Sequence, residues 1–271
     1  MPSTSFFSQS YQHRFGGLIR LYGTQACFKL LHSHVLVIGI GGVGSWIAEA
    51  LVRSGIGTIT LMDLDDICVT NSNRQVHTTC HTVGLSKTTV MAERLKAINP
   101  EVEVHCIDDF IDKSNMTKYI QSDFSFIFDA IDNAIDKTEI IAHCKKNQYP
   151  IITIGSSGGK KDPSRIAYND LTKTTGDPMF LKVRNNLRRK HGFSRDTQQL
   201  FDVEAIYSTE PMTYPDNKGG TSSSKAFIQA GEKLDCGSGY GASTMVTASF
   251  GLLAAARAIE TLIKTKQSTL P

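Results

Sequence analysis

A short glycine-rich stretch near the start of the chain carries its clearest chemical signal. The apolar run 35–38 leads into the sequence Gly-Ile-Gly-Gly-Val-Gly at 39–44, and a helical pattern follows over 45–53. Glycines let a phosphate approach the backbone, and the N-terminus of the next helix attracts its charge. We therefore expect phosphate to bind at the turn that contains Gly39, Gly41, Gly42 and Gly44.

An acidic residue stands where a nucleotide ribose would be held. Residues 58–62 have the composition of a buried strand, and Asp63 follows them, nineteen positions after Gly44. In nucleotide-binding βαβ units, a carboxylate at the end of the second strand holds a ribose hydroxyl. The glycine motif alone would be weak support, but strand, turn, helix and acid together indicate a nucleotide site.

The residues that follow Asp63 indicate which nucleotide is bound. The chain continues with Asn71 and Arg74, and Lys87 stands at the start of a helical pattern. An amide, a guanidinium and an ammonium near a phosphate turn suit the extra charge of a triphosphate. Arg74 or Lys87 taken singly could equally be a solvated surface charge. Together they favour ATP over a dinucleotide, and a dehydrogenase is disfavoured.

The rest of the first half alternates between strand and helix patterns, as βαβ units do. Strands are predicted at 102–107, 124–128 and 151–154, and helices at 86–99 and 134–147. This pattern predicts an α/β, Rossmann-like fold with a mostly parallel sheet. Asp129 and Asp132 follow strand 124–128, at the edge where open parallel sheets bind ligands. We favour Asp132 as functional, whereas Asp129 could equally cap the strand end.

We expect three regions in the chain. Residues 1–33 form an N-terminal helical segment, residues 34–160 the nucleotide-binding core, and residues 161–271 an elaborated region that completes the same domain and contacts substrate. A chain of 271 residues, 40% of them hydrophobic, can bury one large core. The net charge of +3 creates no global field that would attract nucleic acid, so an RNA contact requires a local basic patch.

One candidate for such a patch lies outside the expected nucleotide core. Six basic residues fall within fourteen positions that contain no acidic residue: Lys182, Arg184, Arg188, Arg189, Lys190 and Arg195. The first five are the candidate contacts to nucleic acid. They could form an ordinary solvated helix face, or they could neutralise RNA phosphates and release counterions.

The six cysteines are scattered and contain no C-x-x-C pair, which argues against a zinc clip. The N-terminus has no signal-peptide pattern, so we expect reduced thiols in the cytoplasm. Cys236 is flanked by Asp235 and Gly237 just before the last predicted helix, where a thiol can act as a nucleophile or sulfur acceptor. It could equally be a small residue tolerated in a turn. We expect the following cysteines to pack inside elements: Cys68, Cys80, Cys106 and Cys144.

Residues 237–256 form an uncharged stretch of about the length that spans a bilayer. Their many glycines, serines and threonines, and the charges of Arg257 and Glu260 directly after them, favour a buried helix. Association with a membrane through this segment stays an alternative.

The motifs, taken as a set, resemble the adenylating domain of ubiquitin-activating enzymes and their bacterial relatives in thiamine and molybdopterin synthesis. The resemblance covers roughly 14–155 and rests on residues 38–45, 63–65, 71–75, 87 and 129–133. It implies a fold that binds ATP and activates a carboxylate as an acyl-adenylate. In this family Gly41 would approach the phosphates, and Asp63, beside Asp65, would hold the ribose. Asp132 would lie by Mg²⁺ and the α-phosphate, and the polyphosphate would be held by Asn71, Arg74 and Lys87.

A narrower resemblance covers nearly the whole chain. Residues 14–17, 20–23, 48–51 and 235–242 look like those of bacterial tRNA threonylcarbamoyladenosine dehydratases. That resemblance implies a ligase-type enzyme that uses ATP to cyclise threonylcarbamoyladenosine in tRNA, with Arg74, Lys87 and Asp132 as catalytic residues. It also implies a homodimer and links to a cysteine desulfurase and its sulfur-acceptor protein. DNA is not an expected partner.

One arginine of the wider family, which reaches the partner subunit's ATP across the dimer interface, is replaced by glycine here. Arg14 or Arg20 could substitute for it, and Arg20 is therefore an expected ATP contact. Two other functions remain open. The chain could activate a ubiquitin-like sulfur carrier, with Cys236 as the thioester or persulfide site. It could instead be a non-enzymatic sulfur-acceptor or RNA-binding protein, which the complete set of phosphate-site residues argues against.

Overall fold

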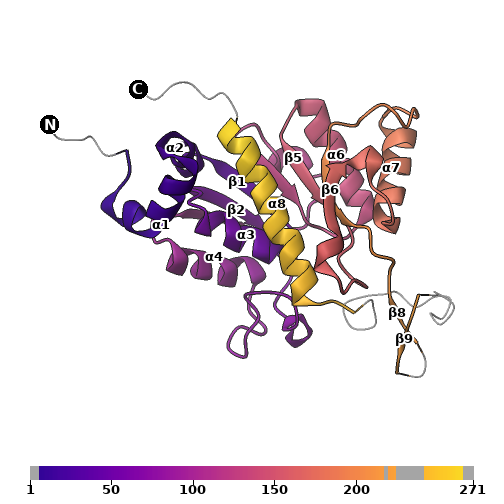
Figure 1. The fold of residues 1–271 in the computed structure, drawn as a ribbon, viewed down its shortest axis with the longest axis horizontal. Helices are drawn as coiled ribbons and strands as arrows, with labels where there is room; N and C mark the ends of the chain where they lie inside the picture. The colour runs from indigo at the N-terminus through magenta and orange to yellow at the C-terminus, as the bar shows by residue number, and fades with distance from the viewer. Residues whose placement is uncertain (1–5, 217–218, 224–240, 265–271) are drawn as a thin grey trace.

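A seven-stranded sheet forms the centre of the molecule (Figure 1). The computed structural model describes residues 6–216, 219–223 and 241–264, so that Cys236 lies outside the described residues. The strand order is β3-β2-β1-β4-β5-β7-β6, and all neighbouring strands are parallel except the β6–β7 pair. The strands are β1 (His34–Ile38), β2 (Thr58–Met62), β3 (Glu103–Ile107), β4 (Phe126–Asp129), β5 (Ile151–Ile154), β6 (Ile166–Asp170) and β7 (Glu204–Ser208).

Helices cover both faces of this sheet, which is why its central strands are almost entirely buried and mostly apolar. On one face lie α3 (Gly44–Arg53), α4 (Lys87–Ile98) and α8 (Thr244–Lys264), whose apolar residues share one core with β1 and β2. On the other face, α6 (Ala134–Asn147) and α7 (Pro178–Lys190) pack against each other over a second core, beside the short α5 (Met116–Tyr119). The α/β, Rossmann-like fold with a mostly parallel sheet is thereby confirmed.

The remaining elements are peripheral. The first two helices, α1 (Gln9–Tyr22) and α2 (Thr24–Leu31), occupy the segment predicted to be helical. Short 3₁₀ turns are found at η1 (Val69–Asn71), η2 (Pro163–Arg165) and η3 (Leu171–Lys173), and a small hairpin is formed by β8 (Tyr214–Pro215) and β9 (Thr221–Ser222).

The C-terminal region adds strands that the sequence did not predict. β7 inserts beside β5, and β6 runs antiparallel to it at the sheet edge. β6 and β7 thus extend the central sheet, whereas β8 and β9 pair only with each other.

Helix α8 is the one described helix that is long and apolar enough to cross a membrane. Half of its most apolar 18-residue window is buried, and it packs against α3 across the face of the sheet (Figure 1). Phe250, Ala254 and Ala258 contribute fully buried side chains to the core there. This position supports the expected core helix over a membrane span.

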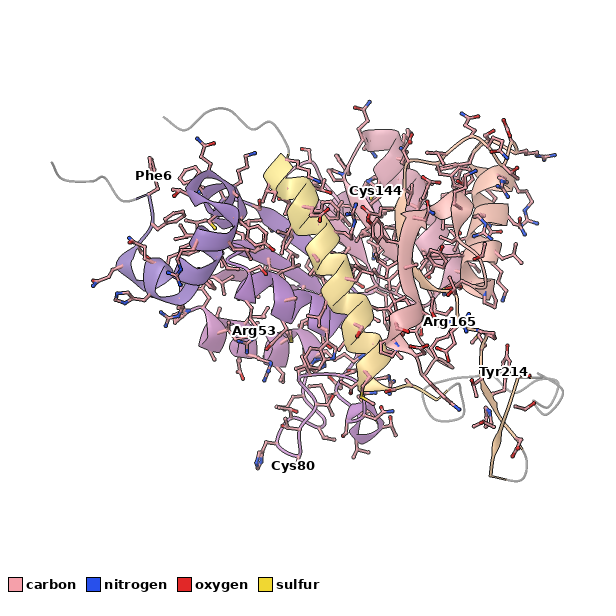
Figure 2. All side chains as sticks on the ribbon, viewed as in Figure 1. Phe6, Arg53, Cys80, Cys144, Arg165 and Tyr214 are labelled. Carbon is pink, nitrogen blue, oxygen red and sulfur yellow. The ribbon has the colours of Figure 1, made fainter. Side chains whose placement is uncertain are left out.

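The cysteine expectation is only partly met. Cys144 is fully buried in the second core, but Cys68, Cys80 and Cys106 are exposed. Figure 2 shows Cys80 at the tip of the loop that leads from η1 to α4, away from the sheet. The loop projects beyond the helices that cover the sheet, so a side chain at its tip has no core to enter.

Candidate nucleotide-binding and adenylation site

The strand order places a topological switch point at the carboxyl ends of β1 and β4. These strands are neighbours, but the helix after β1 (α3) packs on one face and the helix after β4 (α6) on the other. The loops therefore diverge there, and open parallel sheets bind ligands at such switch points. The sequence-predicted glycine turn and Asp132 both lie on these two loops.

Two glycines of the turn are required by close backbone packing. Gly39 has a φ of 87°, and a Cβ at this position would lie 3.1 Å from the backbone of Ala130 and Ile131. A Cβ on Gly44 would overlap the carbonyl oxygen of Gly39. These contacts hold the glycine turn directly against the loop that carries Asp132.

The turn presents a row of free backbone donors. Within the described residues, the amides of Gly41, Gly42, Val43 and Gly44 have no acceptor. Val43, which caps α3, makes no side-chain hydrogen bond to the helix. Unpaired N–H groups and the positive end of the helix dipole form a site for an anion. This is the chemistry that the glycine motif predicts.

Arg74 lies against the open side of this turn. A Cβ on Gly42 would lie 3.2 Å from its Cγ and Cδ. Its Nη1 donates to the carbonyl of Thr70 and to Asn73 Oδ1, both at 3.0 Å, and its carbonyl accepts a hydrogen bond from Trp46 Nε1. The loop and α3 together therefore hold this guanidinium beside the phosphate turn.

Asn71 shapes the same loop from inside. It is buried, and its Oδ1 accepts the amide hydrogen of Cys68 at 3.0 Å. Its carbonyl accepts from the amides of Arg74 and Gln75. Its Nδ2, which has no partner within the described chain, is the group left for a ligand.

Two carboxylates orient Lys87. Its Nζ lies 2.7 Å from Asp65 Oδ2 and 3.5 Å from Asp63 Oδ1. Asp63 is nearly buried, and its oxygens accept from the amides of Ile40 at 2.7 Å and Asp65 at 2.9 Å. Asp63 thus ties the end of β2 to the glycine turn. Lys87 opens α4, which Ser86 caps, so its position follows from the helix start.

Asp132 is exposed on the loop between β4 and α6, one residue before the α6 cap Asn133. Arg20 is not brought to this site within its own chain. It lies on α1, whose Arg14 donates to the carbonyl of Ile98 and whose Tyr11 donates to that of Gly55. Ile98 precedes β3 and Gly55 precedes β2. Helix α1 therefore lies at the amino ends of the strands, whereas the glycine turn lies at their carboxyl ends.

A buried charge cluster that the sequence did not reveal underlies the Asp132 loop. Lys137 and Asp129 are both fully buried, with Lys137 Nζ 2.8 Å from Asp129 Oδ1. Thr153 donates to the other carboxylate oxygen at 2.7 Å. Burial raises the pKa of Asp129 and lowers the pKa of Lys137, and the attraction between the two charges opposes both shifts. Asp129 is therefore a structural residue here.

Two further buried residues were missed. Asp177 caps α7 and accepts the amide of Ser156 at 2.7 Å, which fixes the loop after β5. The Asp-Pro pair at 177–178 is a readable helix start. His77 is buried near Lys87 and Arg94, and burial, followed by these cations, lowers its pKa to about 4. It is therefore neutral at physiological pH and adds no third cation.

The predicted basic patch is divided by the structure. Arg184 and Arg188 are half-buried: Arg184 donates to Leu171 O and Thr174 Oγ1, and Arg188 donates to Ser194 O. Their guanidinium groups thus fasten α7 to its neighbouring segments. Lys182, Arg189 and Lys190 are exposed. The patch also does not stand apart from the nucleotide core, because α7 packs directly on α6.

Comparisons with known proteins agree with this fold. A model of the ThiF family matches residues 15–271. A tRNA threonylcarbamoyladenosine dehydratase from Haemophilus influenzae is 47% identical over 257 residues, which cover 95% of this chain and 96% of that protein. The Escherichia coli tRNA N6-threonylcarbamoyladenosine dehydratase in complex with ATP is 42% identical with a TM-score of 0.84. The match covers 94% of this chain and 96% of that chain. A complex of the same protein with AMP has a TM-score of 0.83 at the same identity and coverage.

Proposed function

The chain belongs to the ThiF family, and we propose that it uses ATP to dehydrate threonylcarbamoyladenosine in tRNA through a carboxyl-adenylate. The observation that carries the proposal is the row of four backbone amides at the glycine turn that have no acceptor among the described residues, beside Arg74 and Lys87. The relatives named for this reaction match nearly the full length of the chain, and one of them binds ATP and AMP at this fold.

The reaction divides into two steps. The carboxylate of the threonyl group attacks the α-phosphate, and pyrophosphate leaves. The carbamoyl group of the same molecule then attacks the activated carbonyl carbon and displaces AMP, so that the carboxylate loses one oxygen to AMP. Because the reacting groups of the second step already share one molecule, that step requires positioning more than a strong base.

The residues of the site have matching tasks. The glycine-turn amides, Arg74 and Lys87 stabilise the charge that builds on the departing pyrophosphate. Asp63 fits the ribose task less simply, because both its oxygens already accept backbone hydrogens, although a carboxylate oxygen can accept more than one.

Asp132 suits a Mg²⁺ ligand, since it is an exposed carboxylate on the loop that packs against the glycine turn. When bound there, Mg²⁺ would neutralise phosphate charge. The position of the loop, set by Gly39 and by the Asp129–Lys137 pair beneath it, orients this carboxylate.

Assembly and location belong to the same proposal. If Arg20 or Arg14 contacts ATP, it does so from a second copy of the chain, because α1 lies at the amino ends of the strands of its own sheet. We therefore favour a homodimer acting in the cytoplasm. Sulfur transfer through Cys236 from a cysteine desulfurase remains a prediction from the sequence.

A pyrophosphate-release assay tests the function. It compares tRNA carrying threonylcarbamoyladenosine, the same tRNA without the modification, and no RNA. We expect release only with the modified tRNA, together with AMP and a product lighter by one water. Lys96→Ala, which alters an exposed lysine near the C-terminal end of α4, is the control for Arg74→Ala. Release that requires a carrier protein with a Gly-Gly terminus instead of RNA would move the sulfur-carrier function ahead.

A further inference from the structure

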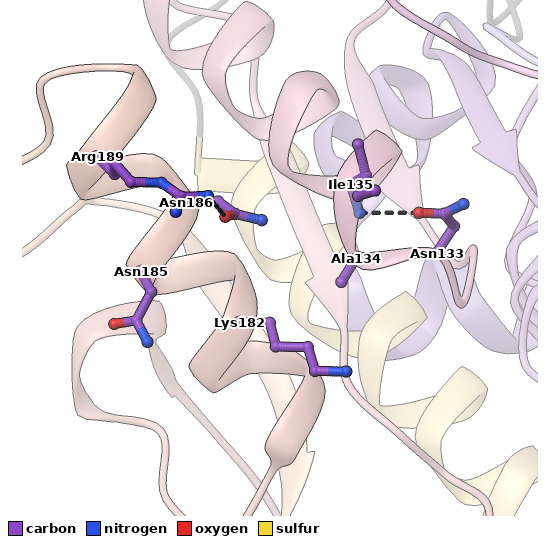
Figure 3. Close-up of a pocket in the computed structure, with 7 residues that line it drawn as sticks. All are labelled: Asn133, Ala134, Ile135, Lys182, Asn185, Asn186 and Arg189. Carbon is purple, nitrogen blue, oxygen red and sulfur yellow. Dashed lines mark hydrogen bonds between the residues drawn. The ribbon is translucent and has the colours of Figure 1, made fainter. Parts of the chain in front are cut away.

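A cleft beside the nucleotide site has no assigned task. It measures about 510 Å³ and lies between the start of α6 and the outer face of α7 (Figure 3). We call it the α6–α7 cleft. Its lining consists of Asn133, Ala134, Ile135, Lys182, Asn185, Asn186 and Arg189. This volume falls in the range of small-molecule and cofactor sites, which is roughly 300–1,000 Å³.

Helical periodicity explains which residues of α7 face the cleft. Lys182, Asn185, Asn186 and Arg189 are spaced i, i+3, i+4 and i+7, so they form one stripe along the helix. Figure 3 shows the four on the flank of α7, across from the Asn133–Ile135 turn. The opposite stripe of α7 is buried in the core. The cleft is thus a consequence of how α7 packs.

The lining combines two cations with three amides and contains no carboxylate. Within the described chain, neither Lys182 nor the side chain of Asn185 has a hydrogen-bond or ion-pair partner. Asn186 Oδ1 accepts from Arg189 Nη2 at 3.2 Å, and Asn133 Oδ1 accepts from the amide of Ile135. Both charged donors and amide donors of the cleft therefore remain available to a ligand.

These groups match an unpaired nucleotide. Amide side chains offer both a donor and an acceptor to a base edge, and Lys and Arg pair with phosphate. Ile135 has 59% of its surface exposed and provides an apolar contact for a base or ribose. Sequence-selective RNA binding uses splayed bases of single-stranded loops in this way.

The position of the cleft identifies which nucleotide this would be. Asn133 follows Asp132 directly, and the loop they share packs on the glycine turn. A substrate adenosine that is part of an RNA strand must bring its flanking nucleotides to this edge of the sheet. Resting on the proposed function, we infer that the α6–α7 cleft binds the unpaired nucleotide next to the modified adenosine. Amides contact its base, and Lys182 and Arg189 contact its phosphate.

Binding of an anticodon stem-loop that carries the modified adenosine tests this inference, with fluorescence anisotropy as the readout. We expect Lys182→Ala to weaken binding about tenfold and to lower the salt slope by about 0.7, the value for one lost phosphate contact on a single strand. Asn185→Ala should weaken binding without changing the slope. Lys146→Ala, an exposed lysine at the far end of α6, is the matched control.

A second arm removes the base. Stem-loops with an abasic site on either side of the modified adenosine are titrated with wild-type protein and Asn185→Ala. If the Asn185 amide contacts that base, the losses of binding free energy caused by Asn185→Ala and by the abasic site are non-additive on one side of the adenosine. Additive losses on both sides of the adenosine would overturn the inference that the cleft binds this nucleotide. Equal weakening of stem-loop binding by Lys182→Ala and Lys146→Ala would overturn it too. Since binding is measured without turnover, this outcome is distinct from a wild type that binds the stem-loop but releases no pyrophosphate, which would refute the proposed function.

Discussion

Replacing Lys137 with methionine tests whether the buried ion pair supports the site. Lys137 and Asp129 have no exposed side-chain surface, and Lys137 Nζ also donates to the carbonyl of Asp129 at 3.1 Å and to Thr153 Oγ1 at 3.3 Å. The variant leaves the carboxylate buried with Thr153 as its remaining side-chain donor. Removing one partner of a buried pair costs about 3–5 kcal/mol. Because domains have a free energy of unfolding of only about 5–15 kcal/mol, urea denaturation should show the loss plainly.

The loss should depend on pH in a defined direction. Without the ammonium of Lys137 to oppose it, burial raises the pKa of Asp129 further above its unfolded value. A carboxyl group whose pKa is raised in the folded state favours folding at pH below the unfolded pKa. That contribution is lost as pH rises through the folded pKa. The deficit of Lys137→Met should therefore shrink as the pH falls from about 8 to about 5.

Two further variants make this experiment decisive. Asp129→Asn combined with Lys137→Met removes both charges and should regain most of the loss, because an uncharged pair has no unpaired ion to bury. Lys146→Met removes an exposed lysine from the same helix and should change the free energy of unfolding by no more than about 0.5 kcal/mol. A deficit for Lys137→Met below about 1 kcal/mol at neutral pH would refute the reasoning.

Three other substitutions test the nucleotide site. Arg74→Ala should weaken ATP binding about 10- to 100-fold by calorimetry, the effect of losing a charged hydrogen bond, while the circular dichroism spectrum stays unchanged; saturable NAD binding without ATP binding would contradict an ATP site. Asp132→Ala should lower turnover by about 10²–10³ with a modest loss of ATP affinity, and near-normal turnover at low Mg²⁺ would remove Asp132 from the mechanism. Gly44→Ala should abolish ATP binding because its Cβ would overlap Gly39 O, whereas Gly17→Ala, with nothing nearer than 4.0 Å, should be neutral or stabilising by up to about 1 kcal/mol in thermal denaturation. Equal ATP binding by Gly44→Ala and Gly17→Ala would show that the turn tolerates a side chain.

The nucleotide half of the molecule was predictable because its signals are local. The strand 34–38, the glycine turn and α3 follow one another within twenty residues, and each has its own periodicity or motif. Ser86 before α4 and Pro100 after it marked that helix to within one residue. Local propensity, turn chemistry and apolar pattern agree in this region.

The C-terminal strands escaped prediction for a physical reason. β7 pairs with β5, which lies about fifty residues earlier, and nothing near Glu204 shows that a gap at the sheet edge awaits it. β6 lies at that edge, so its residues alternate in exposure too weakly to be distinguished from a loop. The choice between strand and loop is made there by non-local pairing.

Lys137 and the basic run illustrate the same limit at the site. A lysine in a helix pattern is ordinarily solvated, and only the approach of β4 to α6 places Asp129 against it. The helical period separates Lys182 and Arg189 from Arg184 and Arg188, but which stripe faces solvent depends on the docking of α7. Sequence could therefore identify the charges of the site more readily than their partners.

The carboxylate partners of the lysines explain how the glycine turn and the α6–α7 cleft can bind their anions differently. Lys137 is neutralised by a buried carboxylate and is closed to ligands, whereas Lys87 is held by Asp65, a carboxylate with 56% of its side chain exposed. A triphosphate can displace Asp65 into water at little cost. Asp65 therefore holds Lys87 in position while leaving its ammonium able to pair with ATP. Lys182 has no carboxylate partner within the described chain, so a phosphate there competes only with water and salt. Screening acts most strongly on such exposed charges. RNA binding at the α6–α7 cleft should therefore weaken with ionic strength well before ATP binding at the half-enclosed glycine turn does.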